Sequence, residues 1–171
     1  STPETTSEAL TALAREGSPA EQALAVYTAG EGAANDGEAN IDQLRACLEA
    51  GVDAAPLAVQ RWAVRGLGRL ASTAPAATAT ALSTVTAALT RDDDCVRAYA
   101  AWTLSQLAWT APTLAQPAAE EIVTALESAN RLSSQHLATA LQALPPAALA
   151  AVPNVAQPLM TTLNTAPESV A

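Results

Sequence analysis

The sequence predicts an all-α repeat protein of about four stacked helix pairs, closed at its end by a capping helix. Three observations carry this prediction. The chain aligns with itself without gaps when it is shifted by 37 residues, and its apolar residues recur at helical spacing. The whole chain has only 3% aromatics and no Phe, so alanine and leucine are expected to fill the interior. This composition suits closely packed helices and disfavours a sandwich, because strands favour β-branched and aromatic residues.

The 37-residue period is most visible in two hexapeptides, LASTAP at 70–75 and LAWTAP at 107–112. The similarity spans about residues 41–163. We expect the second helix of each pair to point four columns of residues inward: Val59/Val96/Ser133, Trp62/Tyr99/His136, Ala63/Ala100/Leu137 and Leu67/Leu104/Leu141. Gly66 and Gly68 fall inside one of these helices, where glycine costs about 1 kcal/mol relative to alanine, so close packing is expected there.

Residues 1–37 are expected to form a divergent first helix pair. Ser7 is placed to cap the first helix and Gly17 to end it. The second helix of this pair starts with Pro19 in its first turn and is expected to fray into a loop over residues 30–40, the stretch GEGAANDGEAN.

Residues 38–144 are expected to hold the regular repeats. The predicted helices cover residues 41–50, 55–72, 75–90, 93–110, 116–128 and 130–144. Gly51 is expected to end the first of them. The acidic run Asp92–Asp94 is interpreted as the cap and first turn of the helix at 93–110, because carboxylates stabilise a helix N-terminus.

The C-terminal part is expected to be a cap over residues 145–165 and a disordered tail over 166–171. Pro145 and Pro146 cannot continue the preceding helix. A last helical segment is predicted at 147–164, interrupted near its prolines. Its threonines suit a terminal repeat, which must face water.

Composition bounds the function. A chain of 171 residues fits one domain, 1–171. It has no apolar run of the ~18 residues that span a membrane and no charged-then-apolar leader, so a cytoplasmic protein without membrane contact is expected. Cys47 and Cys95 have no metal-type spacing, and we interpret them as two buried small hydrophobes. No metal or cofactor is expected.

The net charge is −9, and all eight basic residues are Arg. An acidic chain without Lys is typical of proteins adapted to high salt and equally of GC-rich genomes, and both interpretations stay open. In either case the field of the whole molecule repels nucleic acid, so no nucleic-acid partner is expected.

The stretch DDDCVRAYAAWTLSQL, residues 92–107, resembles the second helix of a HEAT repeat. The shared pattern is an Asp, three residues, Val96-Arg97, two residues, Ala100, and then Leu104 and Leu107. Gln60 and Ser134 stand at the positions equivalent to Arg97, so the other repeats depart from the pattern. The resemblance, which extends to the group related to phycobilin lyases, implies a right-handed α–α superhelix and scaffolding or adaptor work more often than catalysis. It also implies that the second helices line the concave face.

A candidate partner site follows from that register. Arg61, Arg65 and Arg69 are spaced by four and form one ridge, and Trp102 and Gln106 lie beside it on the next repeat. Residues 54–91 hold four Arg and no acid, between two acidic ends. Two interpretations stay open: a solvated face that pairs with its acidic neighbours, or a docking groove for an acidic or C-terminal peptide, because Arg and Trp dominate binding hot spots.

Two function classes remain. The first is a non-catalytic protein-binding scaffold, which we prefer because no Ser/His/Asp order, catalytic carboxylate pair or phosphate loop is found. The alternative is a lyase-type or regulatory subunit that handles a bound small molecule. His136, the only histidine, is interpreted as a core or edge residue. A pocket that gathers His136 with acids would favour the alternative.

Overall fold

The computed structural model describes residues 3–35, 41–153 and 155–156, and within these ranges the protein is helical with no strand. The all-α class is therefore confirmed. The helices are α1 Pro3–Glu16, α2 Pro19–Asn35, α3 Ile41–Val52, α4 Leu57–Thr73, α5 Pro75–Thr80, α6 Leu82–Ala88, α7 Asp94–Thr110, α8 Pro112–Ala115, the 3₁₀ turn η2 Gln116–Ala118, α9 Ala119–Glu127, α10 Arg131–Ala143 and α11 Pro146–Ala150.

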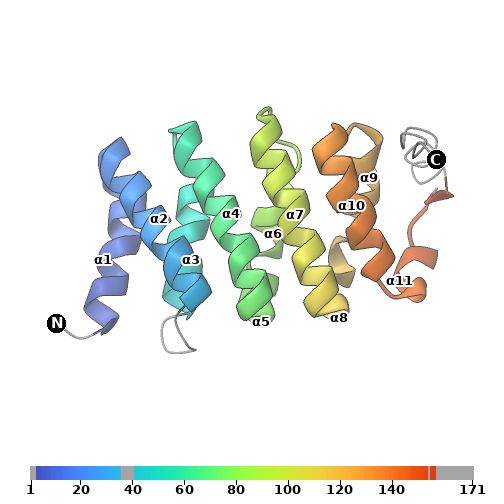
Figure 1. Cartoon of the computed structure of the whole chain (residues 1–171), viewed down its shortest axis with the longest axis horizontal. Helices are drawn as coiled ribbons and strands as arrows, with labels where there is room; N and C mark the ends of the chain where they lie inside the picture. Colours follow the sequence, from blue (N-terminus) through green and yellow to red (C-terminus); the bar gives the residue numbers. More distant parts are fainter. Residues whose placement is uncertain (1–2, 36–40, 154, 157–171) are drawn as a thin grey trace, which may run out of the picture.

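The helices form two layers in a row, with α1 and α11 at opposite ends of the row (Figure 1). One layer holds α2, α4, α7 and α10, and the other holds α1, α3, α5 with α6, and α8 with α9. Helix α4 packs between α2 and α7, and α10 packs on α7. Helices α4 and α7 therefore have a neighbour of the same layer on each side and helices of the other layer behind them, which leaves one open face along the row.

The repeated hexapeptides form the corners between the layers. Ala74 has φ −141° and ψ 69°, and Ala111 has φ −149° and ψ 73°, the extended side of the map that a residue before proline prefers. The N–H of Ala74 donates to the carbonyl of Leu70 at 2.7 Å, which closes the end of α4. Pro75 then starts the next helix at its first position, where no N–H is needed.

The threonine of each corner joins one second helix to the one before it. The Thr73 hydroxyl donates to the carbonyl of Ala33 at 2.7 Å, and the Thr110 hydroxyl donates to the carbonyl of Ala71 at 3.0 Å. These bonds satisfy carbonyls near the ends of α2 and α4, which would otherwise lack partners. The same residue type at the same place in two repeats therefore sets the same contact twice.

Three of the four predicted inward columns are confirmed. The columns of Val59, Ala63 and Leu67 are buried in all three repeats. The column of Trp62, Tyr99 and His136 was placed wrongly, because Trp62 is 38% exposed and the other two are half-buried. Each of these residues precedes the Ala63-type column by one position, a rotation of about 100° on a helix, which turns it toward the open face.

The roles of two glycines, Gly30 and Gly51, were also predicted wrongly. Helix α2 continues to Asn35 rather than fraying from Gly30, and α3 passes through Gly51 to Val52. Gly30 and Gly51 are both buried in helix contacts. A Cβ on Gly51 would lie 2.5 Å from a methyl carbon of Val26, so the residue is selected by packing and does not end the helix.

Other predicted boundaries need smaller corrections. Helix α1 begins at Pro3, so Ser7 lies inside it rather than capping it. The helix predicted at 75–90 is divided at Ala81 into α5 and α6. Helix α11 ends at Ala150, and the predictions for residues 157–171 lie outside the described residues.

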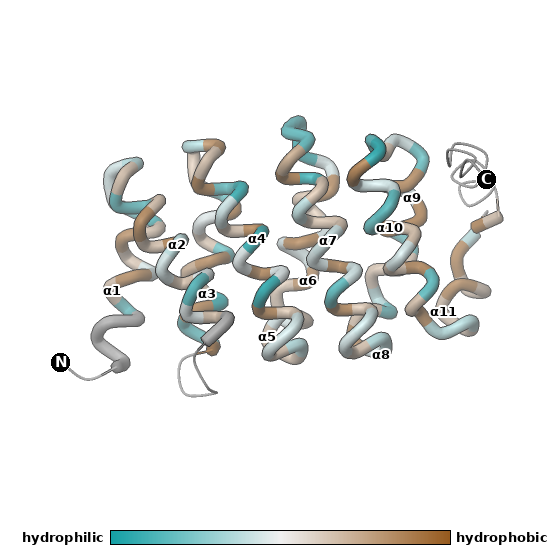
Figure 2. Tube along the Cα trace, viewed as in Figure 1, coloured by the Kyte–Doolittle hydropathy of each residue, from teal (hydrophilic) through white to brown (hydrophobic). Residues whose placement is uncertain are grey.

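The acidic run does begin a helix as predicted. Asp93 caps α7 by accepting the N–H of Val96 at 2.9 Å, and Asn130 caps α10 in the same way. Figure 2 shows the resulting hydrophilic turn before α7. Across the described part of the chain, no helix is long and apolar enough to span a membrane.

Leu104 gives the first prediction, because it lies in the most regular column and is fully buried. Leu104→Ala should lower the free energy of unfolding by about 2–5 kcal/mol through lost transfer energy and a residual cavity. Urea denaturation followed by circular dichroism measures this. Leu24→Ala is the matched control, since Leu24 is 65% exposed and should change stability by less than about 0.5 kcal/mol. Equal effects of the two substitutions would contradict the burial of the column.

Candidate interaction surface

The predicted arginine ridge lies on α4. Figure 2 shows α4 crossed by hydrophilic bands about one turn apart, as expected for Arg61, Arg65 and Arg69 at four-residue spacing. All three side chains are half-buried rather than fully exposed. The three residues have different partners, which divides the ridge into parts with different roles.

Arg61 joins α4 to the start of α7. Its Nε donates to Asp93 Oδ1 at 3.0 Å and its Nη2 to Asp93 Oδ2 at 2.6 Å, a bidentate pair. The hydrogen bond from Arg61, with that from the Val96 N–H, lowers the pKa of Asp93 to about 2 against the opposing effect of burial. One carboxylate thus caps a helix and pairs with the previous repeat. Arg61 is engaged within the protein.

Arg69 joins α4 to α2. Its Nη1 pairs with the Glu31 carboxylate and also lies 3.4 Å from the carbonyl oxygen of Gly30. With its side chain only 27% exposed, Arg69 mainly covers the contact between the two helices. Like Arg61, it therefore has a carboxylate partner inside the chain.

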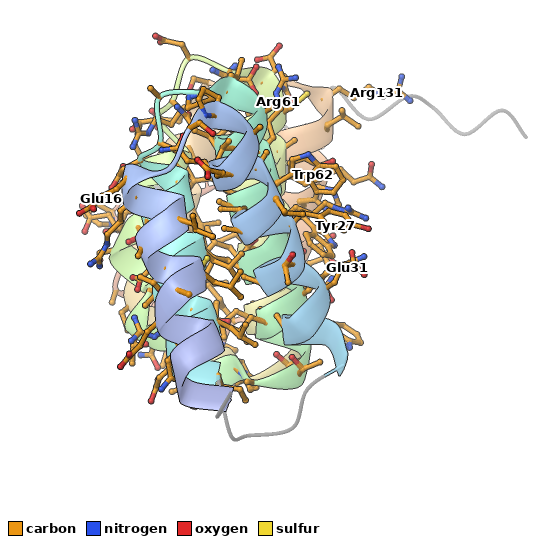
Figure 3. All side chains as sticks on the ribbon, turned by 90° about the vertical axis from the view of Figure 1, so that its left-hand side faces the viewer. Glu16, Tyr27, Glu31, Arg61, Trp62 and Arg131 are labelled. Carbon is orange, nitrogen blue, oxygen red and sulfur yellow. The ribbon has the colours of Figure 1, made fainter. Side chains whose placement is uncertain are left out.

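Arg65, between them, is held by an aromatic ring. Its guanidinium lies 5.1 Å from the centre of the Trp62 ring, a cation–π distance. Trp62 in turn meets Tyr27 edge-on, with ring centres 5.3 Å apart. Figure 3 shows Tyr27 and Trp62 on the same side of the molecule, away from Glu16 on the other layer. In the described part of the chain, Arg65 takes part in no ion pair.

A groove of about 610 Å³ runs along this face between α4, α7 and α10. Its lining is mainly apolar and aromatic, with a basic edge from α4. The lining residues are Arg65, Arg69, Asp94, Cys95, Ala98, Tyr99, Trp102, Leu132 and His136. Leu132 is 63% exposed, so the groove presents apolar surface that no other part of the described chain covers.

Trp102 is positioned by a glycine on the neighbouring helix. A Cβ on Gly68 would collide with the six-membered ring of Trp102 and would lie 2.9 Å from Thr103 Oγ1. The indole therefore rests against the α4 backbone while remaining half-buried. Beside it, the Thr103 hydroxyl donates to the carbonyl of Val64 at 3.1 Å. Close packing explains Gly68, as the sequence predicted.

The groove lining also includes three side chains that can react or titrate: Cys95, His136 and Asp94. Cys95 was predicted to be buried but is exposed, because it lies in the first turn of α7 on the open side. Partial burial lowers the pKa of His136, because desolvation disfavours the charged imidazolium. Asp94 pairs with Arg97. Cys47 is buried as predicted, and burial raises the pKa of its thiol to about 11.

Three of the five predicted site residues share this groove: Arg65, Arg69 and Trp102. Arg61 lies beyond it, paired with Asp93. Gln106 lies outside the lining, where its side-chain oxygen accepts from the Ser72 hydroxyl at 3.0 Å.

Sequence reasoning missed Tyr99 and His136 as groove residues. Their signal was present as an aromatic column that recurs every 37 residues with Trp62. Leu132 occupies the position equivalent to Cys95 one repeat along, so the 37-residue shift relates these two lining residues as well.

Comparison with known proteins identifies the fold only. No family model matches the chain, and no curated protein matches it. The chain is similar to the crystal structure of an engineered protein studied by the Northeast Structural Genomics Consortium, with a TM-score of 0.75 and 24% identity. The match covers 96% of this chain and 74% of that one. At this identity the likeness shows a shared helical fold.

Asp93 generates a prediction on pH. Its pKa of about 2 lies below the value of about 3.9 for an unfolded Asp, so its charge stabilises the folded state above pH 4, and this contribution is lost as the pH falls toward 2. Asp93→Asn keeps a capping side chain but removes the charge. Urea denaturation of both proteins between pH 6 and pH 2.5 should show a stability difference that shrinks as the pH falls. A difference that is constant with pH would contradict the ion pair.

Gly68 generates a further prediction, on packing. Gly68→Ala should lower the free energy of unfolding by about 1–3 kcal/mol, because the added methyl displaces Trp102 or separates two helices. Gly30→Ala is the matched control, since its Cβ would meet Gly66 Cα at an ordinary 3.5 Å and helix propensity would gain about 1 kcal/mol. Thermal denaturation compares them. Similar stabilisation by both substitutions would contradict the close contact between Gly68 and the Trp102 ring.

Proposed function

We propose that this protein is a non-catalytic interaction module that binds a segment of another protein on the face formed by α2, α4, α7 and α10. The observation that carries the proposal is the groove of about 610 Å³, in which Trp102, Tyr99 and Leu132 lie beside Arg65. Aromatic residues and Arg are enriched in the cores of protein interfaces, and anchors of these types contribute most of the binding energy.

The proposal includes the finer architecture. We interpret the row of helix pairs as a short HEAT-like solenoid, a right-handed α–α superhelix whose regular repeats cover 38–144 and whose concave face is the open face. The corner threonines support this interpretation, because Thr73 and Thr110 join successive repeats through equivalent hydrogen bonds. In such stacks each repeat contacts its neighbours and the row presents an extended binding surface.

We place the protein in the cytoplasm. Its charge favours a protein partner over nucleic acid. The net charge of −9 repels a phosphate backbone, while the four Arg within residues 54–91 form a local basic belt. Three of these, Arg61, Arg69 and Arg91, already pair with carboxylates of this chain. The belt therefore suits a partner that brings little negative charge rather than a polyanion.

One observation favours the alternative of a module that handles a small molecule. The groove gathers His136, Cys95 and Asp94 on one lining, and its volume is within the range of small-molecule sites. Native mass spectrometry of the protein from its own cells separates the two functions. A copurifying small molecule that is lost in His136→Gln would support the alternative and count against the scaffold.

Trp102 provides the test of the scaffold. Trp102→Ala should weaken capture of the native partner at least about thirtyfold, since truncation of a central aromatic anchor costs about 2 kcal/mol or more. Trp109→Ala is the matched control, because Trp109 is on the same helix, is 76% exposed and lies outside the groove lining. Quantitative affinity capture from native lysate, with each variant at equal folded concentration, measures both. Partners retained equally by the two variants would show that the groove is not the binding site.

A further inference from the structure

The three arginines of the ridge are unequal as ligands for a partner. The fork of Arg61 is closed by both oxygens of Asp93, and Arg69 pairs with Glu31. Arg65 lines the groove and takes part in no ion pair among the described residues. The groove therefore offers one guanidinium whose charge is not matched within this part of the chain.

Arg65 is also held in place for a ligand. Its guanidinium lies over Trp62 at 5.1 Å, and Trp62 is fixed by its edge-on contact with Tyr27. A guanidinium over a ring keeps its N–H groups free at its edge, and its planar fork matches a carboxylate with two parallel hydrogen bonds. Less side-chain freedom is then lost when the ligand binds.

The surface next to Arg65 is apolar. Trp102, Tyr99 and Leu132 line the same groove, with Trp102 at the position equivalent to Arg65 one repeat along. A ligand that pairs with Arg65 therefore lies in a groove that also offers it an apolar surface. The matching ligand carries a carboxylate and an apolar group close together.

The remaining charges limit the ligand to a single negative charge. Asp94 lies on the groove lining, although its carboxylate pairs with Arg97. The chain as a whole carries −9. A run of acidic side chains would meet this field with only one open guanidinium to offset it. In a protein partner, the unit that joins one carboxylate directly to an apolar side chain is the last residue of the polypeptide.

We propose that the groove between α4, α7 and α10 binds the free C-terminus of a partner that ends in an apolar residue. The terminal carboxylate pairs with Arg65, and the last side chain packs against Trp102 and Leu132. This inference rests on the proposed function and names its ligand. The specificity lies in Arg65, because the apolar contacts alone accept any apolar segment.

Synthetic peptides test the inference with the full chain. Three N-terminally labelled peptides share a polar stretch and end in Leu: one has a free carboxylate, one a terminal carboxamide, and one a carboxamide preceded by an internal Asp. Fluorescence anisotropy measures their affinities. The free acid should bind at least about tenfold more tightly than either carboxamide, the gain expected of one charge-assisted pair. Replacing the terminal Leu by Ser should weaken the free acid by a similar factor.

Variants identify the residue responsible. Arg65→Gln should abolish the preference for the free acid, and Arg65→Lys should reduce it, because Lys keeps the charge but lacks the fork. Arg15→Gln is the matched control, since Arg15 is exposed at the end of α1 in the other layer and should leave the preference unchanged. Circular dichroism of each variant confirms that it is folded.

The outcomes separate this inference from the proposed function. The C-terminal ligand is overturned if the free acid binds no more tightly than the carboxamide, or no more tightly than the internal-Asp carboxamide. It is also overturned if no peptide binds. A preference that survives in Arg65→Gln overturns the role of Arg65. None of these results affects the Trp102-dependent capture of a native partner, whose failure instead overturns the interaction module itself.

Discussion

The close approach of α4 to its neighbours is the constraint on which the rest of the structure depends. On one side Gly66 meets the Leu48 side chain and the backbone of Gly30, and on the other Gly68 receives the Trp102 ring. A larger residue at Gly66 or Gly68 would displace the Leu48 or Trp102 side chain or separate the helices. At this spacing the Thr103 hydroxyl reaches the carbonyl of Val64 on the preceding helix, and Arg65 and Trp102 from successive helices line one groove. The stability of the row and the shape of its open face thus have one physical origin.

The interior could be predicted because two independent periods agree there. The 37-residue shift and the helical period both place Leu67, Leu104 and Leu141 inward, and all three are buried. Helix ends were less predictable. Glycine commonly follows the end of a helix, yet Gly51 lies inside α3, where it packs against Val26. Intrinsic helix propensity is a weak effect compared with burial in such a contact. A single sequence shows the glycine and not the side chain that lies against it.

The candidate surface could be predicted only in outline. The four-residue spacing places three arginines on one side of α4, but their carboxylate partners lie far along the chain: Asp93 is 32 residues from Arg61, and Glu31 is 38 residues from Arg69. Charge counts do not reveal which arginine stays open. The aromatic column is equally hard to place from sequence. Trp62, Tyr99 and His136 recur like core residues, and the periodicity of a column is the same whether it faces the core or the rim of a groove.

The two corners have a consequence for how such a chain can change in length. Because Ala74 and Ala111 share nearly the same backbone conformation and are each followed by proline, the segment 74–110 starts and ends in equivalent geometry. A tandem duplication of the 37 codons for this segment would insert a whole helix pair with ready-made junctions. The added helix would carry its own copies of Tyr99 and Trp102, so the gene could lengthen the open face in whole steps while each existing contact keeps its neighbours.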